Sequence, residues 1–333
     1  MPLPTALNTM KPWLIRGAKL AVLLLVFWFI RRTLHDAWDQ LTRQDSGLSP
    51  WNVQPLWLIA SGAIYLLGFF FAGLFWRQLL RGLGQEAGLG ETLRAYYIGH
   101  LGKYVPGKAM VVVLRAGLIR SHRVSTAVAA VSVFLETFTW LAVGGFLAAT
   151  VLAVQQRGNP AALWGAVLMM VVMGVPTLPP VFRAIVRTSR TGRRYPETVA
   201  HLEKLNARTV LTGWLLNLLV WALLGVSYWA VLRGMGIAGV SLWHLPRYVG
   251  SVALATLAGF IILILPGGIG VREAALIEQM VPYLEPLTDN AAAIALLSAV
   301  WLRVVWLLAE VAISGILYVA GPRPTAAAGP QED

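Results

Sequence analysis

Long apolar runs separated by short polar segments make up most of the sequence. A helix needs roughly 20 mainly apolar residues to cross the hydrocarbon core of a bilayer. Arg31 and Arg32 follow the first run without a small-residue cleavage pattern, so this run is expected to be a retained span rather than a signal peptide. The runs predict six membrane-spanning helices, at about 12–30, 55–76, 124–150, 160–181, 209–232 and 291–320.

Two further apolar stretches, 92–119 and 251–281, are each interrupted by a Pro-Gly pair. Proline removes a backbone donor and clashes with the preceding turn, while glycine permits a reversal of the chain. The resulting half-helices, roughly 12–15 residues long, are too short to cross the membrane separately. They predict two re-entrant hairpins, a form tolerated only inside protein or around a water-filled cavity. The predicted break residues are Pro106, Gly107, Pro266, Gly267, Gly268 and Gly270.

The composition agrees with a membrane protein. Hydrophobic residues make up 57% and charged residues 13% of the chain, with a mean hydropathy of +0.67, against about 45–50% and about 25% in soluble globular domains. This composition excludes a disordered, collagen-like or disulfide-built protein, and the absence of cysteine excludes thiolate chemistry. The predicted fold class is an all-α integral membrane protein, with one polytopic domain over 1–320 and a disordered polar tail over 321–333.

The formal net charge of +12 is concentrated in a few polar segments. Segment 182–208 and the amino terminus are rich in Lys and Arg, and segment 77–91 adds Arg77 and Arg81. These parts are expected to face the cytoplasm, whereas the acidic segment 266–290 suits the outer side. Anionic lipid explains this charge better than nucleic acid does. Six spans and two hairpins would place both termini in the cytoplasm, at a bacterial inner membrane. A full span at 247–265 would instead move the carboxyl terminus to the outside, and the sequence leaves this choice open.

A short string occurs twice. Leu-Arg-Gly-Leu-Gly at 80–84 returns as Leu-Arg-Gly-Met-Gly at 232–236, each time at the end of an apolar run. In both places a Pro-Gly break, an arginine and a long apolar run with a central charge follow. This order favours duplicated halves, about 55–150 and 209–320, in opposite orientations, and such inverted repeats are a common transporter plan. Chance recurrence at span ends is the alternative.

Charges inside the apolar runs are candidate functional residues. Glu136 lies near the centre of 124–150 and Arg303 near that of 291–320. A charge at mid-bilayer costs about 2.5–3.5 kcal/mol on insertion scales, so these side chains are expected to face a cavity or a partner. Two interpretations stay open. One is a structural ion pair of Arg303 with Glu136 or with Glu310, which lies on nearly the same helix face. The other is a polar path for a lipid headgroup.

The segment around the first break is rich in cations. Lys103 and Lys108 flank the break, and Arg115 lies two turns further on. A break exposes unpaired backbone donors where the helix dipole favours an anion, so this segment predicts a phosphate site. The second break offers backbone amides, Arg272 and Glu273, whose carboxylate is expected to meet a cationic group or to cap the helix. The alternatives are lysines that reach out to the interface and glycines that permit close helix packing.

Together these motifs resemble one bacterial family. They are Gly-Lys-Tyr-x-Pro-Gly-Lys at 102–108 with a following arginine, a glutamate in the next span, Pro-Gly-Gly-x-Gly-x-Arg-Glu at 266–273, and an arginine in the last span. Over about 12–320 the chain is similar to the lysylphosphatidylglycerol synthase transmembrane-domain family, whose founding members fuse a lipid flippase domain to a soluble aminoacyl-transferase domain. The resemblance implies a domain that moves phospholipids between leaflets. The transport residues that it implies are Lys103, Tyr104, Lys108, Arg115, Glu136, Arg272, Glu273 and Arg303.

The sequence departs from the family pattern in two places. Thr137 follows Glu136 where many relatives are expected to have an arginine, and only a short tail follows the last span. We therefore expect no aminoacyl-transferase domain and no lysyl transfer, and the cargo stays open. The histidines have no metal-ligand spacing and no phosphate-binding loop is present, so neither a metal, a cofactor nor ATP-driven pumping is expected.

These observations favour a lipid translocase without enzymatic activity, which moves an anionic or amino-modified lipid between leaflets. One alternative is a membrane-embedded lipid-modifying transferase with Glu136 or Glu273 as its catalytic base. Another is a non-transporting subunit that holds a separate soluble synthase through the basic loop 183–204. The expected partners are membrane lipids, with a soluble synthase or a second copy of the chain as further candidates, and no nucleic acid.

Overall fold

The computed structural model describes residues 52–105, 109–121, 123–155, 160–261 and 270–321, together with Arg31 and His35. The predicted span at 12–30 and the tail after Gly321 lie outside these residues. Four of the described helices are long and apolar enough to cross a membrane, and the chain is accordingly an all-α multi-pass membrane protein. These helices match four of the six predicted spans: α2 (Pro55–Gly82), α5 (Thr126–Gln155), α10 (Ala207–Gly234) and α13 (Ala291–Ala320).

Two pairs of shorter helices lie between the long ones in sequence. α3 (Leu89–His100) and α4 (Ala109–Ile119) are connected through the 3-10 helix η1 (Leu101–Tyr104), and α11 (Leu245–Ile261) precedes α12 (Val271–Leu284). α4 has 11 residues, so at about 1.5 Å per residue it is about half as long as the hydrocarbon core is thick. The order long, short, short, long therefore occurs twice. We call α2 to α5 the first set of helices and α10 to α13 the second set.

The second break ends at a glycine that the structure describes. Gly270 precedes α12 with φ +84°, a left-handed conformation that glycine adopts without strain. Its N–H donates to Oε2 of Glu273 at 2.7 Å, so Glu273 caps the start of α12. The other predicted break residues lie outside the described part of the chain, as does Lys108; they are Pro106, Gly107, Pro266, Gly267 and Gly268.

The predicted run 160–181 is bent rather than straight. α6 (Pro160–Gly174) leads through η2 (Val175–Thr177) into α7 (Pro179–Thr188), and the axis turns by 71° between 163–177 and 179–188. The prolines at 176, 179 and 180 explain this bend, because each lacks a backbone donor. α7, α8 (Arg190–Arg194) and α9 (Pro196–Leu202) form the basic segment, which is anchored by Phe182 in an apolar cluster with side chains of α2 and α5.

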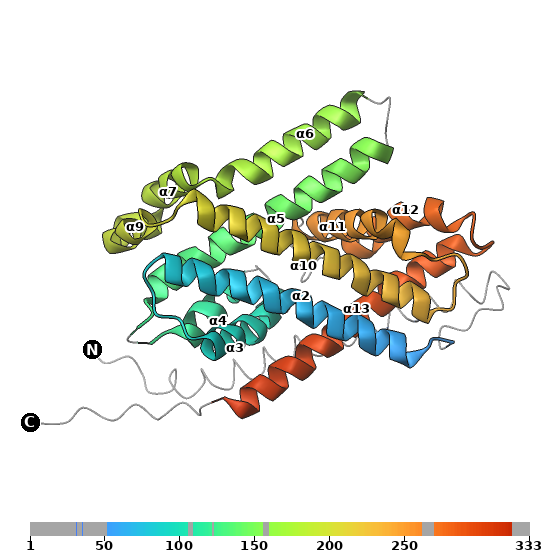
Figure 1. The fold of residues 1–333 in the computed structure, drawn as a ribbon, viewed down its shortest axis with the longest axis horizontal. Coiled ribbons are helices and arrows are strands. Elements are labelled where there is room, and N and C mark those ends of the chain that lie inside the picture. Colours follow the sequence, from blue (N-terminus) through green and yellow to red (C-terminus); the bar gives the residue numbers. More distant parts are fainter. Residues whose placement is uncertain are drawn as a thin grey trace, which may run out of the picture.

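α2 and α10 lie side by side in the centre of the molecule and run in opposite directions (Figure 1). Between them, the hydroxyl oxygens of Ser61 and Ser227 are 2.8 Å apart. Trp306 of α13 donates from its indole N–H to the Ser227 hydroxyl oxygen at 2.9 Å. Small residues and hydrogen bonds between helices are the usual means of holding membrane helices together, so these contacts join the two central helices to α13.

The two pairs of short helices lie toward opposite ends of the long helices. α3 and α4 lie near the end of α2, whereas α11 and α12 lie toward the other end, near the start of α13 (Figure 1). α3 packs on α2 and α13, and α11 packs on α10 and α5. Each short pair therefore contacts the first long helix of its own set and the last long helix of the other set.

The recurring pentapeptide ends a helix in both places. Gly84 and Gly236 have φ of +77° and +73°. The N–H of each glycine donates to the carbonyl of the arginine three residues earlier, at 2.9 Å and 3.0 Å. Helices commonly end at a glycine in this left-handed conformation. The recurrence therefore has a local physical cause, and the two copies have the same position at the ends of α2 and α10.

Candidate functional site

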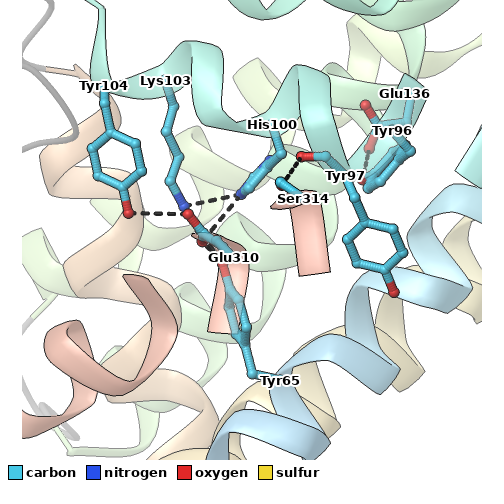
Figure 2. A network of polar contacts seen from close by, with 9 residues as sticks. All are labelled: Tyr65, Tyr96, Tyr97, His100, Lys103, Tyr104, Glu136, Glu310 and Ser314. Carbon is cyan, nitrogen blue, oxygen red and sulfur yellow. Dashed lines mark hydrogen bonds and ion pairs between the residues drawn. The ribbon is translucent and has the colours of Figure 1, made fainter. Parts of the chain in front are cut away.

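A buried carboxylate on α13 is the centre of a polar cluster. Glu310 accepts hydrogen bonds through Oε1 from Lys103 Nζ at 2.5 Å and from the Tyr65 hydroxyl, and through Oε2 from the Tyr104 hydroxyl at 3.0 Å. His100 Nε2 lies 3.6 Å from Oε1 and 2.9 Å from Lys103 Nζ. Figure 2 shows the Glu310 side chain between these groups, which come from α2, α3 and η1.

The Glu310 cluster connects parts of the chain that are far apart in sequence. Lys103 and Glu310 are separated by 207 positions. Nearby, the Ser314 hydroxyl donates to the Tyr97 carbonyl at 3.2 Å and Arg94 Nε donates to the Leu317 carbonyl at 3.1 Å. α3 and η1 are therefore fastened along the second half of α13. A charge held in so little water is stable only while its partners stay in place, so the cluster ties the first pair of short helices to α13.

A second ion pair joins α4 to α5. Arg115 donates to Glu136 Oε2 at 2.7 Å, and both side chains are almost fully buried, at 3% and 4% exposure. The Tyr96 hydroxyl donates to the other oxygen of Glu136 at 2.8 Å, and the Arg115 guanidinium lies 3.7 Å from the centre of the Tyr96 ring. Among the described residues, Arg115 Nε has no hydrogen-bond partner, so this buried cation keeps one unused donor.

The Arg115 position depends on a close approach of α3 and α4. A Cβ added to Gly99 would lie 3.1 Å from the backbone nitrogen of Arg115 and 2.5 Å from its Cγ. At Gly102, an added Cβ would lie 2.6 Å from the backbone nitrogen of Val111. Real Cβ atoms do not approach backbone so closely, so glycine at these two positions allows the short helices to pack and places Arg115 against Glu136.

A third ion pair joins α12 to α13. Arg303 donates to Glu273 Oε1 at 2.8 Å, while the other oxygen of this carboxylate caps α12. The Arg272 guanidinium lies 4.6 Å from the Trp306 ring centre, and Trp306 stacks on Tyr65 with ring centres 4.4 Å apart. Because Tyr65 is a Glu310 donor, the aromatic stack leads from the second pair of short helices to the Glu310 cluster.

The ion pairs of the two helix sets mirror each other with the charges exchanged. In the first set the short helix carries the arginine and the long helix carries the glutamate, as Arg115 on α4 and Glu136 on α5. In the second set the short helix carries Glu273 and the long helix carries Arg303. In each set, a charge pair with a buried carboxylate therefore joins the second short helix to the following long helix.

The structure corrects the predicted partners of the central charges. The ion-pair interpretation joined Arg303 to Glu310 or Glu136, but Arg303 pairs with Glu273, Glu136 with Arg115 and Glu310 with Lys103. The reason is helix packing: Glu310 faces α2 and η1, whereas Arg303, two turns earlier, lies against the start of α12.

The predicted phosphate site is also arranged differently from a simple cluster of cations. Lys103 and Arg115 contact different carboxylates, and Lys108 lies outside the described residues. Sequence reasoning used Glu310 only as a neighbour of Arg303 and did not select Tyr65, Tyr96 or His100. A carboxylate in the apolar run of α13 was the available signal for Glu310. Tyr104, a second donor to Glu310, was selected through the family motif. Tyr65 and Tyr96 carry no such signal, because an uncharged side chain does not stand out in an apolar run.

The described residues contain no group of three or more His, Asp or Glu side chains arranged to hold a metal ion. The polar groups of the site are cations, carboxylates and tyrosine hydroxyls from seven helical elements, namely α2, α3, η1, α4, α5, α12 and α13. Such a site can exchange its internal ion pairs for contacts to a charged ligand, provided that the helices separate.

Comparison with known proteins gives one family. The model of the lysylphosphatidylglycerol synthase TM region matches residues 17–309. This match includes all four long helices, with the last residues of α13 outside it. No curated protein and no solved structure matches the chain.

Proposed function

The chain belongs to the lysylphosphatidylglycerol synthase TM-region family, and we propose that it is a lipid translocase that moves a phospholipid between the leaflets of a membrane. The proposal includes an anionic or amino-modified headgroup as cargo and no enzymatic step. We place the protein in a bacterial inner membrane, with membrane lipids as its partners. The observation that carries the proposal is the set of three ion pairs, each with a buried carboxylate, between helices of a multi-pass membrane protein.

Ion pairs with buried carboxylates meet the main requirement of lipid translocation. The barrier to moving a headgroup across a bilayer is the cost of removing its charges from water. A protein lowers this cost when it offers counter-charges along the way. Lys103 with Glu310 and Arg115 with Glu136 provide both signs of charge in the interior, and Arg115 retains an unused donor among its described neighbours. A headgroup could replace one partner of each pair without leaving a buried charge alone.

The arrangement of the helices supports alternating access. We interpret α2 to α5 and α10 to α13 as inverted repeats, with α3–α4 and α11–α12 as re-entrant hairpins from opposite sides. The opposite directions of α2 and α10 and the exchanged charges of the two sets support this interpretation. Transporters with inverted repeats move one repeat against the other around a central site. In this mechanism, the Glu310 cluster opens when α13 separates from η1 and α2.

Replacement of Glu310 by Gln tests the proposal. The variant keeps the shape of the side chain but removes the charge that Lys103 and the two tyrosines hold. We expect the exchange of a fluorescent phospholipid between the leaflets of reconstituted vesicles to fall by at least about tenfold, because a charge-assisted hydrogen bond contributes roughly 1.5–3 kcal/mol and about 1.4 kcal/mol corresponds to tenfold in rate.

Glu278→Gln is the matched control. Glu278 is an exposed carboxylate on α12 and lies outside the ion pairs described above. It should exchange lipid at the rate of the unsubstituted protein. Equal rates of lipid exchange by the Glu310 and Glu278 variants would show that the charge of Glu310 does not contribute to translocation. Vesicles with the unsubstituted protein that exchange lipid no faster than protein-free vesicles would refute translocation itself.

A further inference from the structure

A charged cavity lies at the end of α2, away from the three ion pairs. It has a volume of about 560 Å³ and is open to the outside, a size in the range of roughly 300–1,000 Å³ that is usual for small-molecule sites. α2 supplies one wall, and the loop 84–88, the start of α3 and the connection between α4 and α5 supply the others. Its charged lining residues are Arg77, Arg81, Glu86, Glu91 and Arg123.

The walls of this cavity are held together by hydrogen bonds. Arg77 Nε donates to the Ala87 carbonyl at 3.1 Å, which fixes the guanidinium against the loop. The Glu86 N–H donates to the Arg123 carbonyl at 3.3 Å. The Ser125 N–H donates at 2.8 Å to Oε1 of Gln85, whose side chain is buried. These hydrogen bonds hold the loop 84–88 to α2 and to the connection between α4 and α5, so the walls of the pocket are fixed relative to one another.

The two arginines that α2 contributes to the pocket do not form ion pairs with its glutamates. In the part of the chain that the structure describes, no ion pair joins Arg77 or Arg81 to Glu86 or Glu91. Arg81 and both glutamates are exposed at the pocket. Guanidinium groups bind phosphate oxygens with two parallel hydrogen bonds, and a carboxylate is the natural partner of an ammonium group. Arg77 and Arg81 beside two glutamates thus match a ligand that carries both charges.

We propose that this pocket binds a phosphate that carries an ammonium group a few bonds away, with the phosphate at the arginines and the ammonium at Glu86 and Glu91. α2 is long enough to cross the membrane and ends at Gly82, so the pocket lies where a span meets the membrane surface. A lipid headgroup of the phosphoethanolamine type and a soluble phosphoamine share this chemistry. The inference does not depend on translocation, since binding is measured without transport.

Calorimetric titration of the purified full chain, in detergent free of phospholipid, tests the site. The probes are phosphoethanolamine, inorganic phosphate and a short-chain phosphatidylethanolamine. We expect Arg81→Gln to weaken the binding of all three by about tenfold, because one charge-assisted contact to the phosphate is lost. Glu91→Gln should weaken both amine-containing probes and leave inorganic phosphate unchanged.

Arg233→Gln is the matched control, because Arg233 has the position of Arg81 in the second pentapeptide and is exposed at the end of α10. It should leave all three affinities unchanged. Tighter binding of the short-chain lipid than of phosphoethanolamine would support a headgroup site, and equal binding would support a soluble ligand. The inference is overturned if none of the probes binds, if Arg81→Gln behaves like Arg233→Gln, or if Glu91→Gln weakens inorganic phosphate as much as the amines.

Discussion

Each buried carboxylate of the site has a cationic partner and at least one further hydrogen-bond donor. Glu136 accepts from Arg115 and from the Tyr96 hydroxyl, and Glu273 accepts from Arg303 and from the start of α12. Removing two charges from water costs free energy that only complete sets of contacts offset. The charges are therefore stable as pairs and unstable singly.

This dependence predicts the stability of variants at Arg115 and Glu136. Arg115→Met or Glu136→Met alone should lower the free energy of unfolding by about 3–5 kcal/mol, since each leaves an uncompensated buried charge. The double variant should be more stable than either single variant, because two apolar side chains of similar volume then replace the ion pair and no buried charge is left alone. Reversible unfolding in mixed detergent micelles measures the three values. A double variant that loses the sum of both single losses would show that the pair is not coupled.

At this scale, the sequence identified cations and carboxylates but not their partners. Glu136, Arg303 and Arg115 could be selected because a charge in an apolar segment is costly. The pairing of Lys103 with Glu310 spans 207 positions and depends on how η1 and α13 pack, which local sequence does not encode. The hydrogen bonds of Tyr65 to Glu310 and of Tyr96 to Glu136 could not be predicted for the same reason.

At the scale of helices, the apolar runs located the elements well and their ends less well. The predicted span 55–76 continues to Gly82, because Arg77 and Arg81 lower the hydropathy of a turn that is still helical. The glycine of the pentapeptide ends it, at Gly84. In 160–181 the prolines interrupt a run whose hydropathy alone indicated one span. Two re-entrant hairpins were predicted, and both their re-entrant form and their orientation in the membrane stay predictions.

The proposed inverted repeat predicts that the pentapeptides lie on opposite sides of the membrane. The chain contains no cysteine, so a single introduced thiol can be labelled without background. Arg81→Cys and Arg233→Cys, both exposed, should react with a membrane-impermeant maleimide from opposite sides of sealed vesicles. The predicted span at 12–30 does not affect this comparison, because it precedes both positions in the chain. Labelling of both positions from the same side would contradict the inverted repeat.

For the whole molecule, the contacts between the two sets of helices are the decisive feature. α2 packs along α10, α3 packs along α13, and α11 packs along α5. The Glu310 cluster lies on one of these boundaries, with Tyr65 and Lys103 from the first set and Glu310 from the second. Translocation by separation of the sets requires this boundary to open, whereas a purely structural ion-pair cluster would remain closed.

A reversible cross-link beside Glu310 tests this requirement. A Cβ added to Gly62 of α2 would lie 3.6 Å from the Cβ of Ala309 on α13, and disulfides form at Cβ distances of about 3.5–4.5 Å. Gly62→Cys with Ala309→Cys can therefore be oxidised to lock α13 onto α2. Gly62→Cys with Gly315→Cys is the control, because no atom lies within 4 Å of a Cβ added at Gly315.

The most direct test of the account is leaflet exchange of a fluorescent phospholipid by the Gly62→Cys/Ala309→Cys protein in vesicles, before and after reduction. We predict exchange at the protein-free rate in the oxidised state and recovery on reduction, with the control pair active in both states. Equal and rapid exchange in both states would show that the boundary at Glu310 need not open, and exchange at the protein-free rate in every state and in the unsubstituted protein would show that the protein does not translocate lipid.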